Sequence, residues 1–305
     1  MKKIAIAGIG GIGGFIGVSL AKNYHKSKQE EIIFICRNET KEAIVQNGLT
    51  LESAAGTLTV LPHRVADAPE EIGILDVLIL ACKSYSLESI IKAYESCIGD
   101  DTVVITLQNV VNGKELIRQY LNKGRIIEGC IYVASNVKNP GYIQHVGGPG
   151  KIFIGGESHN DYRWLMDLLV KGGLDITFEE NIKGVLWKKY LFVAPVAAIT
   201  TAYNISFGEL SANRHLMDVL KNMMVEIQLL AEKEGILLSD DDVSTSYHML
   251  SKFPYSAKSS LQLDVESGKA SEKKFLVDYV MEQSARHALV TPFYNEVNER
   301  ILSLA

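Results

Sequence analysis

A glycine-rich stretch near the amino terminus is the first place where residue types and spacing could do chemistry. It directly follows the apolar run Ile4 to Ala7 and reads Gly8-Ile9-Gly10-Gly11-Ile12-Gly13. A strand that enters a GxGxxG turn and continues as a helix is typical of dinucleotide-binding domains. The first glycine permits the tight turn, the second lets the backbone approach a pyrophosphate, and the third lets the helix pack closely on the strand. We therefore predict that residues 8–13 hold a dinucleotide at the helix amino terminus.

The end of the second predicted strand, Ile32 to Cys36, indicates which dinucleotide is bound. NAD-binding domains usually carry an acidic side chain there to accept the ribose hydroxyls, whereas this chain has Arg37. A guanidinium can pair bidentately with a 2′-phosphate, so Arg37 favours NADP. Glu39 follows closely and could contact a ribose instead, which leaves NAD or dual use open. An exposed surface charge is the alternative interpretation of Arg37.

Two more polar loops follow predicted strands. Lys83 comes after Val77 to Ala81, and Asn109 comes after Val103 to Leu107. Ligands of open α/β sheets collect at the carboxyl ends of the strands, so both loops should face the dinucleotide. Lys83 could meet a phosphate or a substrate carboxylate, and Asn109 could hold the nicotinamide ribose. Ordinary loop polarity would explain either residue equally well.

Lys189 stands out in the second half because it lies in the apolar segment Trp187 to Val193. On a helix it shares a face with Val185 and Val193, whereas Lys188 points about 100° away and is expected to be solvated. An ammonium on an apolar stripe either snorkels to water or acts as a functional cation. Lys189 is therefore a candidate catalytic residue.

The secondary structure that must position these residues is predicted to change near residue 180, from strands alternating with helices to helices alone. In the first half, short apolar runs alternate with helix-like segments, which is the pattern of a parallel sheet covered by helices. The candidate strands are Ile4 to Ala7, Ile32 to Cys36, Val77 to Ala81, Val103 to Leu107 and Ile126 to Tyr132. Leu49 to Ser53 and Thr57 to Val60 predict a hairpin added to this sheet, and Gly141 to Gly156 predicts further edge strands.

The second half is predicted to be helical, because from Asn181 onward apolar residues recur every three to four positions. Asn181 suits the N-cap of the first long helix. The residues expected to punctuate later helices are Gly208, Gly235, Gly268 and Pro292. The sequence thus predicts an α/β fold in which an N-terminal Rossmann-type dinucleotide-binding domain, residues 1–180, precedes an all-helical C-terminal domain, residues 181–305.

The length, composition and net charge of the chain limit the classes of function that it can have. A chain of 305 residues with 47% hydrophobic content can form two domains with buried cores. A net charge of −5 supplies no basic field for nucleic acid or an anionic membrane, so small molecules are the expected partners. The scattered cysteines, expected to be reduced core residues, are Cys36, Cys82, Cys97 and Cys130. Because we find neither an uninterrupted apolar stretch of about 18 residues nor a signal-peptide pattern, we expect a cytoplasmic protein.

In serial order, these motifs resemble those of the ketopantoate reductase family, the 2-dehydropantoate 2-reductases, over nearly the whole chain. They are the GxGxxG turn, Arg37, Lys83, Gln108-Asn109, Leu186-Trp187-Lys188-Lys189, Gly208-Glu209-Leu210, the run Ser259 to Asp264, and Glu272. The resemblance implies NADPH-dependent reduction of a 2-oxo acid to a 2-hydroxy acid. The best named candidate reaction is 2-dehydropantoate to pantoate, in pantothenate biosynthesis. A homodimer is left open.

The resemblance also implies a role for individual residues. Lys189 matches the lysine that protonates the forming alkoxide, and Glu272 matches the acidic residue that accompanies it in catalysis. Ser260 matches a substrate-contacting serine, and Asn109 is expected to contact substrate as well as cofactor. The implied cofactor-side residues are Gly8, Ile9, Gly10, Gly11, Ile12, Gly13, Arg37, Lys83, Asn109, Ala134 and Glu272. No metal is expected.

The chain departs from the family where specificity should lie. The family typically has asparagines four and eight residues after the lysine and a polar residue before the Gly-Glu pair, whereas this chain has Val193, Ala197 and Phe207. Its loop after the fourth strand also has Val110 and Asn112 where glycines are usual. A pocket that loses hydrogen-bonding amides loses selectivity for a polar substrate. Two alternatives stay open, a related NADP-linked dehydrogenase for a more apolar 2-oxo acid and a non-catalytic NADP-binding sensor.

Overall fold

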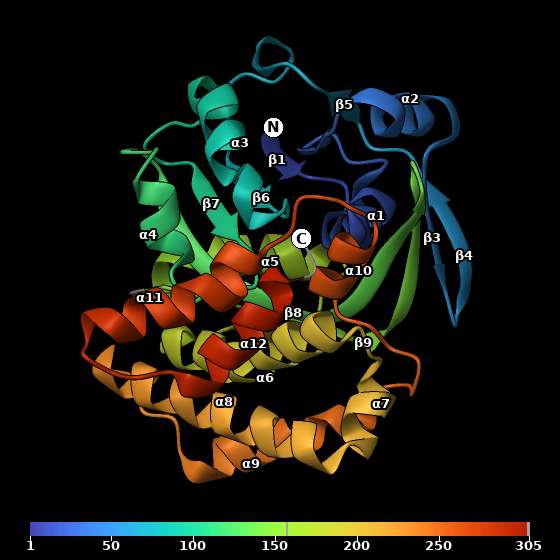
Figure 1. Ribbon diagram of the computed structural model, residues 1–305. Coiled ribbons are helices and arrows are strands. Elements are labelled where there is room, and N and C mark those ends of the chain that lie inside the picture. The colour runs from blue at the N-terminus through green and yellow to red at the C-terminus, as the bar shows by residue number, and fades with distance from the viewer. Residues whose placement is uncertain (157, 304–305) are drawn as a thin grey trace. The chain divides into compact units, whose positions relative to one another are not determined.

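The chain forms two compact units in the computed structural model, which describes residues 1–156 and 158–303 (Figure 1). The first, here called the sheet unit, comprises Met1–Gln108 and Asn112–Ile182. The second, here called the helical unit, comprises Asn109–Val111 and Lys183–Ala305. A short piece of the loop that carries Asn109 therefore belongs with the helices, although it lies in the amino-terminal half of the sequence.

One sheet organises the sheet unit. Its strands are β1 (Lys2–Ala7), β2 (Glu30–Ile35), β3 (Leu49–Ser53), β4 (Gly56–Val60), β5 (Arg64–Ala66), β6 (Val77–Leu80), β7 (Val103–Thr106), β8 (Arg125–Asn139), β9 (Tyr142–Gly155) and β10 (Ile176–Phe178). Their order is β4-β3-β9-β8-β7-β6-β1-β2-β5, with β10 also paired to β9. The run from β5 to β8 is parallel, and only the β3–β4 and β8–β9 pairs are antiparallel among the described strands. The predicted Rossmann-type core is confirmed.

Two sheet predictions have different outcomes. The hairpin is confirmed, since β3 and β4 pair antiparallel and lie at the edge of the sheet. The prediction that Gly141 to Gly156 supplies edge strands was wrong, because β9 is one strand of 14 residues inside the sheet. The hairpin strand β3 covers one end of β9, pairing Thr50 with Tyr142, and β10 covers the other, pairing Ile176 with Ile152. The glycine-rich sequence suggested an edge strand, but it does not show that β3 and β10 pair with β9.

Alternate residues of the strands face two separate hydrophobic clusters. Ile4 and Ile6 of β1 belong to the cluster that includes residues of α1 (Gly11–Tyr24), α2 (Asn38–Asn47) and α5 (Arg163–Lys171). Ala5 and Ala7 belong to the cluster that includes residues of α3 (Leu87–Tyr94) and α4 (Gly113–Arg118). This alternation is the period of a strand buried on both faces, so helices cover both sides of the sheet as the sequence predicted. None of the four cysteines forms a disulfide within the described residues, and two are buried and two half-buried.

The helical unit confirms the predicted all-helical second half. Its longer elements are α6 (Ile182–Tyr203), α7 (Phe207–Ala212), α8 (Arg214–Lys233), α9 (Asp240–Met249), α10 (Ser260–Glu266), the π-helix η6 (Lys274–Asp278), α11 (Tyr279–Arg286) and α12 (Pro292–Leu302). Short 3₁₀ turns complete the chain, η1 (Pro69–Glu71), η2 (Ser84–Ser86), η3 (Glu95–Cys97), η4 (His159–Tyr162) and η5 (Leu250–Lys252). α6 begins directly after Asn181.

The expected helix boundaries hold at three of four positions. Gly235 and Gly268 follow α8 and α10 with φ of +78° and +63°, and Pro292 is the first residue of α12. Gly208 was wrongly predicted as a boundary, since it lies inside α7. Its small size serves packing instead, because a Cβ there would lie 2.1 Å from the ring of Tyr255.

α6 is the core helix of the helical unit. Its buried side chains include Trp187, Tyr190, Leu191, Val196 and Ile199, each at most 3% exposed. By length and composition α6 would also suit a membrane span, with a mean hydropathy of 1.2, but 83% of that stretch is buried inside the structure. Burial within a helical domain accounts for its apolar character.

Candidate active site

The glycine turn has the geometry that a dinucleotide cradle needs. Gly8 adopts φ of +93°, a left-handed conformation that side chains disfavour. A Cβ at Gly13 would lie 1.9 Å from the Gly8 carbonyl oxygen, so the helix can approach the strand this closely only because residue 13 is glycine. A Cβ at Gly10, the N-cap of α1, would meet nothing within 4 Å. The backbone therefore presents an open surface at the helix amino terminus, where an anion would meet unpaired N–H groups.

A fourth glycine of the turn has a role that the motif alone does not specify. A Cβ at Gly11 would lie 1.9 Å from the carbonyl oxygen of Ser135 on β8. Ser135 follows Ala134, where the pairing of β8 with β9 is irregular. Ala134 is thus next to the glycine turn in the sheet unit, which is compatible with its expected place on the cofactor side.

Arg37 lies just beyond the end of β2 and directly before α2, and it is exposed. Within the part of the chain that the structure describes, its side chain makes no hydrogen bond or ion pair with protein. Lys41, one helical turn later, is instead held by Asp67 at 2.7 Å. Arg37 is consequently available to an outside anion, and its assignment to a 2′-phosphate stays a prediction.

Gln108 joins the two loops that follow β6 and β7, a function the sequence reasoning missed. The side chain is 5% exposed, and its Nε2 donates to the carbonyl oxygens of Leu80 and Cys82 at 3.0 Å each. Its Oε1 accepts a hydrogen bond from the hydroxyl of Thr106. A carboxamide directly after a buried strand was the available signal, because such a group must find partners when buried. The half-buried Lys83 follows Cys82 and so sits on a loop held by Gln108.

The two lysines of α6 have the different environments that the helical period predicts. Lys188 is exposed and its Nζ lies 2.8 Å from Oδ1 of Asp242. Lys189 is half-buried and its Nζ donates to Oδ1 of Asn109 at 2.7 Å. The structure therefore brings together, within the helical unit, two predicted site residues from opposite halves of the sequence. The carboxamide oxygen orients the ammonium without neutralising its charge.

Glu272 is 5% exposed and begins the segment that leads into η6. Its backbone carbonyl accepts hydrogen bonds from the amides of Phe275 at 2.9 Å and Leu276 at 3.1 Å. Glu272 therefore begins the helical turn that leads into η6. Its catalytic role stays a prediction.

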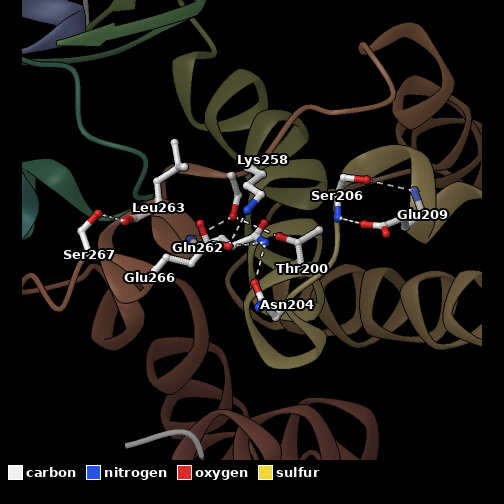
Figure 2. Close-up of polar contacts among 10 residues, drawn as sticks. Thr200, Asn204, Ser206, Glu209, Lys258, Gln262, Leu263, Glu266 and Ser267 are labelled. Atoms are coloured by element: carbon white, nitrogen blue, oxygen red, sulfur yellow. Dashed lines mark hydrogen bonds and ion pairs between the residues drawn. The ribbon is translucent and has the colours of Figure 1, made fainter. Parts of the chain in front are cut away.

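Ser260 is the exposed first residue of α10, and its buried neighbour Ser259 is the N-cap. The Ser259 hydroxyl accepts from the amide of Gln262 at 3.2 Å and lies 3.0 Å from the hydroxyl of Thr200 on α6. Figure 2 shows that Gln262 also points at Asn204, at the end of α6, with 3.4 Å between Nε2 and Oδ1. These contacts hold the start of α10 against α6, which fixes the place of Ser260.

The structure explains one of the three apolar residues that stand where the family has polar ones, and leaves the other two as candidates for selecting the substrate. Phe207 is 7% exposed, and its ring packs edge-on against Phe253, which stacks on Phe192 with ring centroids 5.4 Å apart. Phe207 is thus part of an aromatic cluster. Val193 is half-buried and Ala197 is 3% exposed, and both follow Lys189 along α6 at helical spacing. Those two positions remain candidates for selecting the substrate.

Comparisons with known proteins agree with one another. Family models described as "Ketopantoate reductase PanE/ApbA" and its C-terminal counterpart match residues 4–158 and 181–304. A 2-dehydropantoate 2-reductase of Mesorhizobium japonicum is 30% identical over 261 residues, 77% of each chain. The uncharacterized oxidoreductase YkpB of Bacillus subtilis is 27% identical over 298 residues, which is 97% of this chain and 96% of that protein.

A solved structure shows the same fold over the whole length. The PanE/ApbA family ketopantoate reductase of Ralstonia eutropha JMP134 superposes with a TM-score of 0.89 at 24% identity, covering 99% of this chain and 98% of that one. The two family models together span most of the chain. The chain therefore belongs to the ketopantoate reductase family, whose members are NADP-dependent oxidoreductases that reduce 2-oxo acids.

Proposed function

We propose that this enzyme reduces a 2-oxo acid to the 2-hydroxy acid with NADPH, and that Lys189 is the proton donor. The observation that carries the proposal is the 2.7 Å hydrogen bond between the Lys189 ammonium and the Asn109 carboxamide. An ammonium held on a mostly buried helix is oriented before substrate arrives, which is how a positioned acid contributes to rate. The best named candidate substrate is 2-dehydropantoate.

Residues of the sheet unit fit NADPH. The bare backbone at Gly10 and the amino terminus of α1 suit a pyrophosphate. The exposed guanidinium of Arg37 suits the 2′-phosphate, because a bidentate pair forms with phosphate oxygens. When bound, NADPH supplies the hydride that the keto carbon accepts.

Lys189 has two tasks in this proposal. As negative charge develops on the keto oxygen, the ammonium stabilises it and then gives that oxygen a proton, which leaves a neutral hydroxyl and a neutral lysine. Solvent must return the proton before the next turnover. Val185 and Val193 lie one turn before and one turn after Lys189 on the same face of α6, so the ammonium is carried on an apolar stripe.

Glu272 and Ser260 complete the proposed constellation. The buried carboxylate of Glu272 accepts hydrogen bonds only, so it suits a substrate hydroxyl or a ribose hydroxyl. The exposed hydroxyl of Ser260, at the amino terminus of α10, suits a substrate carboxylate or hydroxyl. Asn109 contributes by holding Lys189 and can also contact the cofactor.

The alternative substrate is a more apolar 2-oxo acid. Val193 and Ala197 carry no hydrogen-bonding groups on the stretch of α6 that follows Lys189. Apolar surface distinguishes poorly between a hydroxylated substrate and one without the hydroxyl, whereas a polar site left without its partner rejects a ligand strongly. These two positions therefore give the hydroxyl of 2-dehydropantoate no hydrogen-bonding partner, so an apolar 2-oxo acid can compete with it at this site.

Oxidation of NADPH by the purified protein with a panel of 2-oxo acids tests both candidates. We expect kcat/KM for 2-dehydropantoate to fall below about 10⁴ M⁻¹ s⁻¹, the lower end of the range for working enzymes, and an apolar 2-oxo acid to do better. The double variant Val193→Asn with Ala197→Asn should recover 2-dehydropantoate turnover more than either single change. Efficient turnover of 2-dehydropantoate by the unmutated protein would instead establish it as the substrate. Absence of NADPH oxidation with every acid would contradict the proposed function.

A further inference from the structure

Tyr190, the residue after Lys189, makes a part-buried long-range hydrogen bond that the proposed reaction does not use. The side chain is 2% exposed, and its hydroxyl donates to the carbonyl oxygen of Phe275 at 2.7 Å. Phe275 lies within η6, the π-helical turn that follows Glu272. Both partners belong to the helical unit. The contact therefore joins the helix that bears Lys189 to the turn that Glu272 opens.

The π-helical turn is an unusual backbone that needs support. Single π-turns are rare because they widen the helix, and they occur frequently at functional sites. Here the amide of Tyr279 donates to the carbonyl of Lys274, five residues back. An ion pair with the same spacing, Lys273 Nζ to Asp278 Oδ1 at 2.5 Å, also spans the turn. The Tyr190 hydroxyl adds a third restraint, from a different helix.

The ring of Tyr190 is held as firmly as its hydroxyl. Trp187 and Tyr279 both meet it edge-on, with ring centroids 6.0 Å and 6.2 Å away. Burial raises the pKa of Tyr190 well above its usual value, with a smaller contribution from Tyr279. The hydroxyl therefore keeps its proton at neutral pH and always has one to donate.

We propose that Tyr190 is a positioning residue, whose hydroxyl holds the π-turn at Phe275 and thereby sets the place of Glu272 relative to Lys189. The proposal rests on the proposed function for its catalytic consequence. Phe275 is bonded through its amide to the Glu272 carbonyl and through its carbonyl to Tyr190. A shift of Phe275 is consequently passed to the backbone of Glu272. Removing one hydroxyl should loosen the turn without opening a cavity.

The chain offers a matched control for this test. Tyr294 is another fully buried tyrosine of the helical unit, and its hydroxyl has no hydrogen-bond partner among the described residues. Tyr190→Phe and Tyr294→Phe each remove one oxygen atom from a buried ring. Only the first removes a hydrogen bond to the turn.

Amide hydrogen exchange followed by mass spectrometry tests the structural half without any need for activity. We expect peptides covering residues 272–280 to exchange about fivefold to tenfold faster in Tyr190→Phe than in the unmutated protein, because a lost hydrogen bond changes an opening equilibrium by about that factor. Tyr294→Phe should leave these peptides unchanged. Equal exchange in the two variants would overturn the proposal.

Steady-state kinetics with the best substrate of the panel tests the catalytic half. Tyr190→Phe should lower kcat about tenfold, because small misplacements of catalytic groups are costly. The dissociation constant for NADPH should change less than about twofold, and Tyr294→Phe should retain full kcat. In a Glu272→Gln background, Tyr190→Phe should lower kcat less than about twofold further, because both changes then act on one interaction.

The outcomes separate this inference from the proposed function. A full additional tenfold loss in the Glu272→Gln background would show that Tyr190 acts elsewhere and would overturn the positioning role. If no 2-oxo acid supports NADPH oxidation by the unmutated protein, the proposed function is wrong, and the exchange measurement alone decides whether Tyr190 orders the turn. Unchanged kcat together with faster exchange would also contradict the catalytic half.

Discussion

At the scale of single residues, Lys188 and Lys189 show how one helical step separates two identical side chains. Lys188 is 53% exposed and pairs with Asp242, whereas Lys189 is half-buried and donates to Asn109. An exposed ion pair contributes little to stability. A positioned ammonium on a buried helix, in contrast, can serve as a general acid.

Substituting these lysines separately tests which one takes part in the reaction. Lys189→Ala should lower kcat by about 10² to 10⁴, the usual contribution of a general acid, while NADPH binding survives. Lys188→Ala should change kcat less than about twofold. Both kcat values are measured as initial rates with saturating NADPH and a saturating 2-oxo acid. Equal losses in the two variants would point to damage of α6 and against a proton donor.

Ala288 is strained in a way that a single substitution can relieve. It has φ of +56° directly after the C-cap His287 of α11, where the amide of Leu289 donates to the carbonyl of Ser284 at 2.9 Å. This position usually holds glycine, because a Cβ disfavours the left-handed conformation. Ala288→Gly should raise the free energy of unfolding by about 1 kcal/mol.

Ala285→Gly is the control for that change. Ala285 is also exposed but lies within α11, so glycine there should lower stability by about 0.5 to 1 kcal/mol. Urea denaturation followed by circular dichroism measures both. Destabilisation by Ala288→Gly would show that the strain is offset elsewhere.

At the scale of elements, α6 makes the contacts that hold the other segments of the proposed site within the helical unit. Its residue Lys189 meets Asn109, Tyr190 reaches the turn after Glu272, and Thr200 meets the N-cap of α10. The three contacts lie along one helix, whose rigidity converts them into a fixed spacing. In the proposed site, the length of α6 therefore sets the spacing of these segments, while its apolar side chains form the core.

α12 depends on a glutamate from another helix for its amino-terminal cap. The buried carboxylate of Glu226 on α8 accepts from the amides of Phe293 at 2.9 Å and Tyr294 at 3.0 Å. Burial raises the pKa of Glu226, and the two hydrogen bonds oppose that rise. The carboxylate satisfies donors that a helix amino terminus leaves without intrahelical partners.

Glu226→Ala should lower the free energy of unfolding by about 2 kcal/mol, because one buried and one part-buried N–H group lose a charged acceptor. Glu226→Gln keeps one acceptor oxygen and should lose less. Glu232→Ala, at an exposed position of the same helix, should change stability by less than about 0.5 kcal/mol. Chemical denaturation ranks the three variants. The cap assignment fails if Glu226→Ala and Glu232→Ala behave alike.

At the scale of the whole molecule, the net charge of −5 does not attract an anionic cofactor. The choice between NADPH and NADH therefore depends on local positive charge. The exposed Arg37 should favour NADPH over NADH by at least about tenfold, equivalent to about 1.4 kcal/mol. NADPH should accordingly raise the melting temperature more than NADH at equal concentration. Arg37→Ala should remove most of that difference.

Arg214→Ala, at another exposed arginine, should leave the preference intact. Fluorescence titration of both cofactors gives the two dissociation constants directly. Equal affinities of the unmutated protein for NADPH and NADH would exclude a role of Arg37 in recognising a 2′-phosphate.

The sequence by itself determined those features that depend on neighbouring residues. The glycine turn, the alternation of strands and helices, the all-helical second half and the different faces of Lys188 and Lys189 all follow from local period and local backbone preference. The order of motifs along the chain indicated the family, and two family models match the same span. Each motif lies within a few turns or one strand, and their order can be read without knowing how the chain folds.

Only the tertiary structure decided what depends on partners far apart in the chain. The bond from Lys189 to Asn109 spans 80 residues, and that from Tyr190 to Phe275 spans 85. The place of β9 inside the sheet likewise depends on β3 and β10. A buried polar group must find a partner, but its identity depends on which elements pack together and in which register. That choice is made by the whole core, so no local pattern contains it.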